Sequence, residues 1–300
     1  MNSLAPIILF TYKRLDTLKL TVSALKLNFL AIESELIIYS DGPKTENDCQ
    51  AVVMVRSYLK TIQGFKSINI IESSINKGLA SSIIEGVTHV INKYGKAIVL
   101  EDDLFCTPNF LNFMNQSLVH YKNKSEVFSI SGYSFNLNIG KEYEFDTYFL
   151  NRGWSWGWAT WSNRWENIDW EIRDYSSFKI DKKSQKEFSK GGSDLNNMLR
   201  KQMNGDLDSW AIRWFYNQYK TQGLTVYSKE SMVFNNGFDL QATHTTGSSK
   251  RYIPTMDDGL KLDFKFPTYI SETKVAQKLF QQKMGYLSRI KSKIETILGL

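Results

Sequence analysis

Three consecutive acidic residues, Glu101, Asp102 and Asp103, directly follow the aliphatic run of residues 97–100. Adjacent carboxylates repel one another, and burying any of them without a partner is costly. A metal ion, a set of backbone donors or exposure to water would compensate for that cost. Because Mg²⁺ and Mn²⁺ prefer oxygen ligands together with substrate phosphates, the triplet indicates a cation site. The alternative is a solvated turn at the end of a strand.

The elements that must position this triplet alternate regularly over the first hundred residues. Apolar runs predict strands at residues 6–12, 34–42, 66–73 and 96–103, and helical spacing predicts helices at residues 14–28, 47–62 and 78–94. This rhythm indicates βαβ units and a mainly parallel sheet. Ligands bind such sheets at the carboxyl ends of the strands, where the acids and the turns after the other strands are expected to meet.

Composition narrows the class of protein. The 300 residues are 42% hydrophobic and carry a net charge of +6, which favours anionic partners. The charge is spread along the chain, so no nucleic acid partner is expected. The two cysteines have no metal-ligand spacing and suit a reducing compartment. The N-terminus is interpreted as a first strand rather than a signal peptide, and no run approaches the roughly 18 apolar residues of a membrane span. A cytoplasmic protein is expected.

Glycine-rich phosphate loops are absent from the sequence. No G-x-G-x-x-G follows a predicted strand, and no Walker-type G-K-[ST] occurs. A Rossmann dehydrogenase and a P-loop enzyme therefore both lose support. A divalent cation on carboxylates remains a way to hold a diphosphate.

The segments IILFTYKR, IIYSDGPK, INKGLASS and IVLEDDLFCTPNF occur in an order that resembles the GT-A nucleotide-sugar glycosyltransferases. The E-D-D-L run is similar to the variant D-x-D metal motif of N-acetylglucosaminyltransferase I and its bacterial relatives. The resemblance covers roughly residues 5–245. It implies an α/β GT-A fold with a mainly parallel sheet flanked by helices, dependence on Mn²⁺ or Mg²⁺, and inverting chemistry.

The resemblance also implies roles for the acidic residues. Asp103 is expected to be the direct metal ligand, Asp102 to contact the ribose and metal-bound water, and Glu101 to contact the donor sugar. Asp41, after the second strand, is expected to bind the nucleotide base.

Further donor contacts are expected from residues that follow the first and third strands. Thr11 and Arg14 follow the first strand and Lys77 the third, and the resemblance implies nucleotide or diphosphate contacts for them. The alternative for Lys77 is a solvated loop lysine. For Arg14 it is a cation at a helix N-terminus that pairs with Asp16.

The stretch NRGWSWGWATWSNRWENIDW holds six of the eight tryptophans. Trp158, Trp161 and Trp165 have helical spacing and are predicted to form a packed helix face. Trp154 and Trp156 alternate with small residues, which suits a tight backbone beside a sugar ring. The resemblance places such a segment near the donor sugar and the acceptor, with core packing as the rival interpretation.

An inverting transferase needs a general base that accepts the proton of the acceptor hydroxyl. The resemblance places this base in an acid-then-tryptophan pattern, which here reads Asp208-Ser209-Trp210, one residue displaced from the strictest match. Asp208 is the candidate and Asp206 the reserve, with a helix N-cap as the alternative role. The resemblance further gives His244 a diphosphate or metal role in a C-terminal loop, against a packed or surface histidine.

The predicted organisation is a GT-A domain over residues 1–270, with a nucleotide-sugar half at 1–105 and an acceptor half at 106–270. Residues 180–197 are polar and are interpreted as a mobile surface excursion. Residues 271–300 have apolar positions at three- and four-residue steps among lysines and an arginine, which predicts a basic amphipathic helix. It is expected either to dock on the enzyme or to contact an anionic membrane.

Together with these observations, the resemblance implies an inverting glycosyltransferase that moves a sugar from a nucleotide diphosphate, with UDP expected, to a hydroxyl of a glycan or lipid-linked acceptor. The resemblance implies surface polysaccharide biosynthesis. A nucleotidyltransferase is one alternative, although the first predicted strand lacks its glycine-rich loop. A non-catalytic sugar-binding protein is the other.

Overall fold

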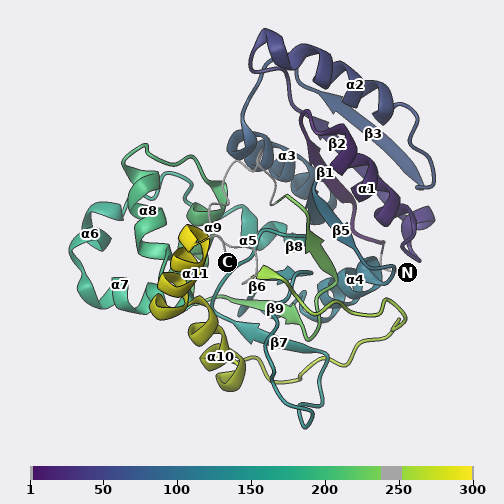
Figure 1. The fold of residues 1–300 in the computed structure, drawn as a ribbon. Coiled ribbons are helices and arrows are strands. Elements are labelled where there is room, and N and C mark those ends of the chain that lie inside the picture. The colour runs from purple at the N-terminus through teal and green to yellow at the C-terminus, as the bar shows by residue number, and fades with distance from the viewer. Residues whose placement is uncertain (1–2, 238–251, 299–300) are drawn as a thin grey trace.

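The computed structural model describes residues 3–237 and 252–298, and in these residues an eight-stranded sheet forms the centre (Figure 1). The strand order is β3-β2-β1-β4-β8-β6-β9-β7, and β10 and β5 form a separate pair. The strands are β1 (Ile7–Thr11), β2 (Glu35–Ser40), β3 (Ser67–Glu72), β4 (Lys96–Glu101), β5 (Leu104–Cys106), β6 (Val127–Ser131), β7 (Thr147–Leu150), β8 (Trp158–Trp161), β9 (Leu224–Ser228) and β10 (Val233–Asn235).

The direction of the strands confirms the predicted mainly parallel sheet. β1 is parallel to β2 and β4, β2 is parallel to β3, and β6 is parallel to β9. β8 lies antiparallel between β4 and β6, and β7 is antiparallel to β9. The carboxyl ends of β1, β2, β4, β6 and β9 therefore share one edge of the sheet, and β8 begins at that edge.

Helices cover both faces of this sheet (Figure 1). The α-helices are α1 (Leu15–Lys26), α2 (Cys49–Leu59), α3 (Leu79–Tyr94), α4 (Phe110–His120), α5 (Ser162–Trp165), α6 (Tyr175–Ile180), α7 (Lys182–Phe188), α8 (Leu195–Met203), α9 (Trp210–Lys220), α10 (Lys274–Met284) and α11 (Tyr286–Leu298). Three short 3₁₀ helices lie among the described residues: η1 (Ala31–Glu33), η2 (Glu46–Asp48) and η3 (Ser189–Gly191).

Alternation along β1 shows why both faces are covered. Ile7 and Leu9 belong to the apolar cluster that includes α1, α2 and α4, whereas Ile8 and Phe10 belong to the cluster of α3 and α9. Successive side chains of a strand point to opposite faces, so an unbroken aliphatic run is buried on both sides. The strands and helices predicted for the first hundred residues are confirmed.

The tryptophan-rich stretch corrects one prediction. Trp158 and Trp161 lie on β8 rather than on a helix, and Trp165 lies on the short helix α5. On a strand, residues three apart face opposite sides of the sheet. Accordingly, Trp158 packs in the cluster with α3 and α9, and Trp161 packs in the cluster with α1 and α4. The spacing of the tryptophans alone did not distinguish a helix from a strand, because Trp158, Trp161 and Trp165 are all buried.

At residues 180–197, where a mobile surface excursion was predicted, the structure has α7, η3 and the start of α8. Phe188 and Leu195 are buried in the cluster with α9. Two apolar side chains at the right places therefore anchor a stretch whose composition is mainly polar.

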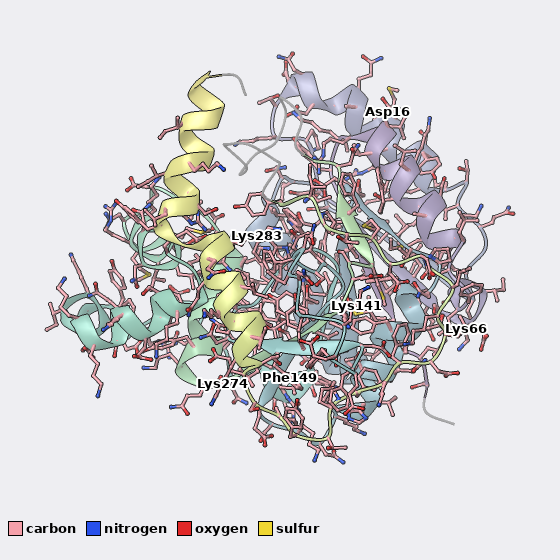
Figure 2. The ribbon with its side chains drawn as sticks, turned by 60° about the horizontal axis from the view of Figure 1, so that its bottom comes forward. Asp16, Lys66, Lys141, Phe149, Lys274 and Lys283 are labelled. Atoms are coloured by element: carbon pink, nitrogen blue, oxygen red, sulfur yellow. The ribbon has the colours of Figure 1, made fainter. Side chains whose placement is uncertain are left out.

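The C-terminal tail forms two helices rather than one. Gly285 is extended and separates α10 from α11. Phe280 and Met284 on α10 are fully buried, and Thr273 pairs with the backbone of Phe149 just before α10 begins. Figure 2 shows Lys274 beside Phe149, with Lys283 near the other end of α10. α10 is therefore part of the core. None of the helices in the described ranges is long and apolar enough to cross a membrane.

Candidate active site

Asp102 sits at the carboxyl edge of the sheet and is held by the loop that follows β1. Its carboxylate accepts hydrogen bonds from Thr11 Oγ1 (2.9 Å) and from the backbone N–H of Tyr12 (3.2 Å) on Oδ2. Arg14 Nη2 donates to its Oδ1 at 2.6 Å. The side chain is only 5% exposed, so these contacts replace the water that burial removes. The expected convergence of Thr11, Arg14 and Asp102 is confirmed.

Arg14 bridges the two aspartates. Its Nη2 also donates to Asp103 Oδ2 at 2.9 Å. Burial alone would lower the pKa of Arg14, but the charges of Asp102 and Asp103 outweigh it and raise the pKa. The structure thus pairs Arg14 with the acidic triplet and not with Asp16.

The small β5–β10 pair brings a distant part of the chain to Asp103. Leu104 pairs with Asn235, and the backbone N–H of Asn236 donates to the carbonyl oxygen of Asp103 at 3.0 Å. A Cβ on Gly237 would lie 2.2 Å from Asp103 Oδ2, so a larger residue there would displace this carboxylate. Sequence reasoning missed Gly237, because its position depends on strand pairing across more than a hundred residues.

Glu101, at the end of β4, completes the triplet. Burial, with the nearby charges of Asp103 and Asp102, raises the pKa of Glu101 to about 8. Burial also raises the pKa of Asp103, against the opposing effect of Arg14. Three carboxyl groups, two of them buried and Glu101 partly buried, thus lie near a single guanidinium, and a cation would balance the remaining negative charge.

This donor set fits a divalent cation that is completed by substrate oxygens. Within the described residues, no group of three or more histidine, cysteine, aspartate or glutamate side chains forms a ready-made metal cage. Mg²⁺-type sites need only one or two protein carboxylates beside phosphates and water. Asp102 already accepts three hydrogen bonds, so Asp103 is the better placed of the two aspartates.

Asp41 organises the loop between β3 and α3. Its carboxylate accepts hydrogen bonds from the backbone N–H groups of Gly42 (2.9 Å), Lys77 (2.9 Å) and Gly78 (3.0 Å), and from Asn76 Nδ2 (3.1 Å). The Lys77 side chain turns to Glu85, with Nζ 2.5 Å from Oε2. A loop-ordering role for Asp41 is therefore visible, and its contact with the nucleotide base stays a prediction, as does the phosphate contact of Lys77.

Two supporting groups beside this edge were missed from the sequence. Arg56, on α2, donates to the carbonyl oxygens of Ser40, Asp41 and Ser73, and so ties the ends of β2 and β3 together. Asp48 accepts hydrogen bonds from Tyr12 and Lys13, which fixes the loop after β1. Nothing in the helical pattern of α2 marks Arg56, because its partners lie on other elements and most of them are backbone atoms.

The tryptophans before β8 form the neighbouring wall. Because Trp158 pairs with Val99, the residues that precede it lie at the edge of Glu101. Trp154 is 7% exposed and stacks on Tyr133 with ring centroids 5.2 Å apart, so core packing accounts for most of its surface. Its Nε1 is nevertheless buried without a partner in the described part of the chain. Trp156 is only partly buried, and a sugar contact stays a prediction for both.

Asp208 lies just before α9, at the same edge. Trp210, on the first turn of α9, stacks on Trp158 with centroids 5.1 Å apart. Ser209, not Asp208, is the N-cap, since its side chain accepts from the N–H of Ile212. The Asp208 carboxylate is 71% exposed and lies 3.3 Å from Arg213 Nη2. The helix-cap alternative is therefore wrong for Asp208, and its catalytic role stays a prediction.

The two remaining candidates are Asp206 and His244. Asp206 is exposed, and its backbone N–H donates to the carbonyl of Lys201. His244 lies outside the described residues, so its proposed diphosphate or metal role stays a prediction.

Solved structures offer distant likenesses. One is the mannosyltransferase PcManGT from Pyrobaculum calidifontis in complex with GDP-Man and Mn²⁺ (TM-score 0.37, 12% identity, covering 55% of this chain and 46% of that one). Another is S. aureus TarS (TM-score 0.45, 8% identity, covering 77% of this chain and 36% of that one). The present chain therefore spans less than half the length of either structure. No match was found among curated proteins.

The comparison with protein families is decisive. Residues 7–203 match Glycosyl transferase family 2, a range that includes the acidic triplet, the tryptophan-rich wall and helices α1 to α8. The match does not extend to the narrower resemblance to N-acetylglucosaminyltransferase I. Because the matched range covers more than half of the chain, the protein belongs to glycosyl transferase family 2.

Proposed function

We propose that the protein is an inverting, metal-dependent glycosyltransferase that moves a sugar from a UDP-sugar to a hydroxyl of a glycan or lipid-linked acceptor. The observation that carries this proposal is the acidic triplet at the carboxyl edge of the sheet, in which Asp102 and Asp103 are buried, Glu101 is partly buried and Arg14 is the paired cation. A surface turn would leave these carboxylates in water, whereas here they need a cationic partner beyond one arginine.

Asp103 is the residue proposed to hold Mn²⁺ or Mg²⁺, with His244 as a further ligand in the undescribed segment. When bound, the cation would neutralise charge on the donor diphosphate. Arg14 and Lys77 add positive charge at the same edge, Thr11 and Asp41 order the two loops beside the nucleotide, and Asp102 and Glu101 face the ribose and the donor sugar. UDP as the nucleotide rests on the resemblance of the acidic motif.

Asp208 is proposed as the general base. Its exposed carboxylate accepts the proton of the acceptor hydroxyl while the acceptor oxygen forms a bond to the anomeric carbon of the donor. The bond between that carbon and the diphosphate oxygen breaks, and the nucleoside diphosphate leaves. Direct displacement inverts the anomeric centre, and no covalent sugar–enzyme intermediate is needed. Trp154 and Trp156 are proposed to shape the sugar-binding wall beside this reaction.

The biological setting is proposed to be surface polysaccharide biosynthesis in the cytoplasm, with peripheral contact to an anionic membrane. α11 exposes Leu287 (82%) and Ile290 (45%), which supports a lipid contact for this helix. Lys283 and Arg289 are excluded from that contact, because Lys283 donates to the carbonyl of Asn136 and Arg289 pairs with Asp194. Fewer basic side chains of the C-terminal segment are therefore available for a membrane contact than the sequence suggested.

A donor hydrolysis assay tests the proposal. The full chain is incubated with a panel of nucleotide sugars, with Mn²⁺, with Mg²⁺ and with EDTA, and released nucleotide is measured. Metal-dependent release from one UDP-sugar is expected. The absence of release and of metal-dependent nucleotide binding would favour the non-catalytic sugar-binding alternative, and the family match leaves the nucleotidyltransferase alternative without support.

A further inference from the structure

A cavity of about 630 Å³ lies away from the acidic triplet, among α6, α7 and the last turn of α9. Gln222 and Gly223 border it just before β9, and Asn151 borders it just after β7. Because β9 runs parallel to β4 through β8 and β6, these residues lie at the edge of the sheet opposite Glu101. The cavity is therefore separate from the proposed donor site, and its volume is within the range of about 300–1,000 Å³ typical of ligand pockets.

Several polar groups in this cavity have no partner among the described residues. No hydrogen bond or ion pair there engages the Glu272 carboxylate, the Tyr219 hydroxyl or the Gln222 amide, and Asn151 Oδ1 is buried and unpartnered. Gln222 also has a φ of 54°, an unusual conformation for a residue with a side chain. These unused donors and acceptors suit a ligand with many hydroxyl groups.

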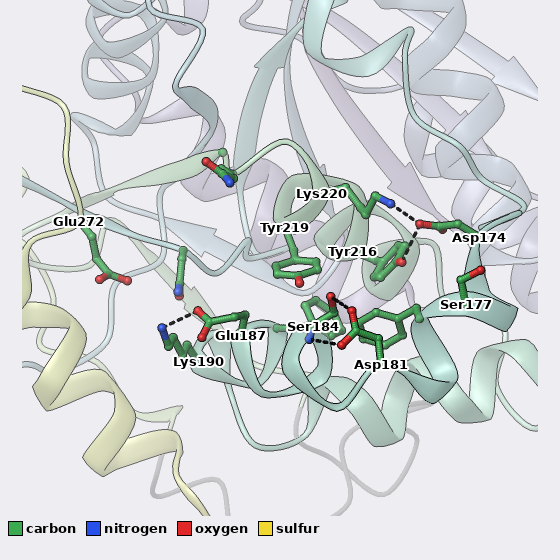
Figure 3. A pocket seen from close by; sticks show the side chains of 15 residues that line it. Asp174, Ser177, Asp181, Ser184, Glu187, Lys190, Tyr216, Tyr219, Lys220 and Glu272 are labelled. Carbon is green, nitrogen blue, oxygen red and sulfur yellow. Dashed lines mark hydrogen bonds and ion pairs between the residues drawn. The ribbon is translucent and has the colours of Figure 1, made fainter.

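The remaining charges in the cavity are paired with one another. Figure 3 shows Asp174 held by Lys220 and Tyr216, and Glu187 held by Lys190. Among the described residues Glu272 makes no ion pair, although the charge of Lys190 acts on it, and Asp181 caps α7. Carboxylates outnumber lysines in the lining, so a nucleotide or another anion is disfavoured.

Aromatic side chains provide the apolar part of the lining. Phe178, Phe188, Tyr216 and Tyr219 contact one another, with centroids 5.0 Å apart for Phe178 and Tyr216 and 5.2 Å apart for Phe188 and Tyr219. Tyr219 keeps partial exposure on the cavity side. A ring face beside carboxylate, hydroxyl and amide groups matches the alternating apolar and hydroxyl surfaces of a sugar chain.

Helix α9 connects this cavity to the proposed base. Asp208 lies just before its first turn, and Tyr219 and Lys220 lie in its last turn. At about 1.5 Å per residue, the 11 residues of α9 span about 16 Å, a distance that a few linked sugars cover. We propose that the cavity binds a remote segment of a neutral oligosaccharide acceptor whose reacting end lies at Asp208. This inference rests on the proposed glycan acceptor and adds a second binding point to it.

The test measures glycan binding and transfer separately. The full chain is screened against an array of neutral, amino and acidic oligosaccharides of graded length, and affinity for the best neutral binder is measured by calorimetry. Glu272→Gln and Gln222→Gly should each weaken binding by about tenfold, because the first replaces a charged acceptor oxygen with an amide NH₂ and the second removes the side-chain amide. Ser177→Trp should block the cavity and weaken binding at least as much. Glu33→Gln, at an exposed site far from the cavity, is the matched control.

The length of the acceptor oligosaccharide provides the second readout. In the cavity variants, the KM for long acceptors should rise toward that for short ones, with donor hydrolysis unchanged and thermal midpoints equal to that of the control. Gln222→Gly keeps the test valid if Ser177→Trp does not fold, since glycine accepts a positive φ. Unchanged affinity in Glu272→Gln and Gln222→Gly, or no neutral glycan binding by a chain that hydrolyses its donor, overturns the inference. If the wild-type protein does not hydrolyse any donor, that result instead contradicts the proposed function.

Discussion

Arg14 Nη2 lies 2.9 Å from Asp103 Oδ2, so a guanidinium already contacts the carboxylate proposed to bind metal. The same nitrogen lies 2.6 Å from Asp102 Oδ1. One fixed positive charge thus holds two aspartates in place before any substrate arrives. It does not balance the whole triplet, and the raised pKa of Glu101, caused first by burial, reflects the remaining negative charge.

Removing this guanidinium should destabilise the protein. Arg14→Gln leaves two buried carboxylates without their cation, and breaking such a pair costs about 3–5 kcal/mol. We expect a lower free energy of unfolding in urea, and a larger stabilisation by Mn²⁺ than in the wild type. Arg173→Gln is the control, because that side chain is 83% exposed and lies 4.0 Å from Asp169. Equal unfolding curves for the Arg14 variant and the control would contradict the pairing.

Asp103→Asn should abolish sugar transfer and metal-dependent nucleotide binding while the fold is kept. The amide has nearly the same shape, and burial already raises the pKa of Asp103, so losing the charge costs little stability. Transfer activity, nucleotide calorimetry with Mn²⁺ and thermal midpoints provide the three readouts. EDTA should reproduce the loss in the wild type. Full activity in EDTA would contradict the metal role.

Asp208→Asn should lower turnover by about 10²- to 10⁴-fold, because it removes the proton acceptor. Donor affinity and stability should be unchanged, since Ser209 provides the helix cap. Ser209→Ala is the matched comparison and should cost about 1 kcal/mol of stability. If Asp206→Asn is the inactive variant instead, the base was assigned two residues away from its true position.

The two C-terminal helices should respond differently to truncation. Deletion from Gln281 removes the fully buried Met284 and should unfold or strongly destabilise the protein. Deletion from Gly285 keeps α10 and should leave a folded enzyme that no longer binds anionic liposomes. Thermal unfolding and liposome sedimentation distinguish the outcomes. Unchanged liposome binding by the shorter chain would show that α11 is not the membrane contact.

Asp194 should make the free energy of unfolding depend on pH. Burial would raise its pKa, but Arg152 (2.9 Å) and Arg289 (2.7 Å) lower it below the ordinary value of 3.8. The Asp194 carboxylate therefore makes its full contribution to the free energy of unfolding above its ordinary pKa. This contribution is lost as the pH falls through the lower pKa of the folded state. Asp194→Asn should lose about 3–5 kcal/mol at neutral pH and show a weaker acid dependence in urea unfolding. A steeper acid dependence would contradict this assignment.

The sequence by itself determined the first half of the sheet and the acidic triplet at its edge. Continuous aliphatic runs such as residues 97–100 must be buried on both faces, and alternating helices supply that cover. Placing Glu101–Asp103 at a ligand-binding edge then required only local pattern and the parallel direction of β1, β2 and β4. These features involve residues close together in the sequence, so the spacing of apolar residues predicts them.

Only the tertiary structure decided the surroundings of the triplet. Gly237 reaches Asp103 through the β5–β10 pair, and Arg56 ties two strand ends through backbone atoms. Neither contact leaves a pattern in the sequence, because both depend on chain segments that meet only after folding. The same applies to α10, whose Phe280 contacts Phe135 with ring centroids 4.9 Å apart. An amphipathic stripe requires an apolar partner, and the packing of the folded body determines what that partner is.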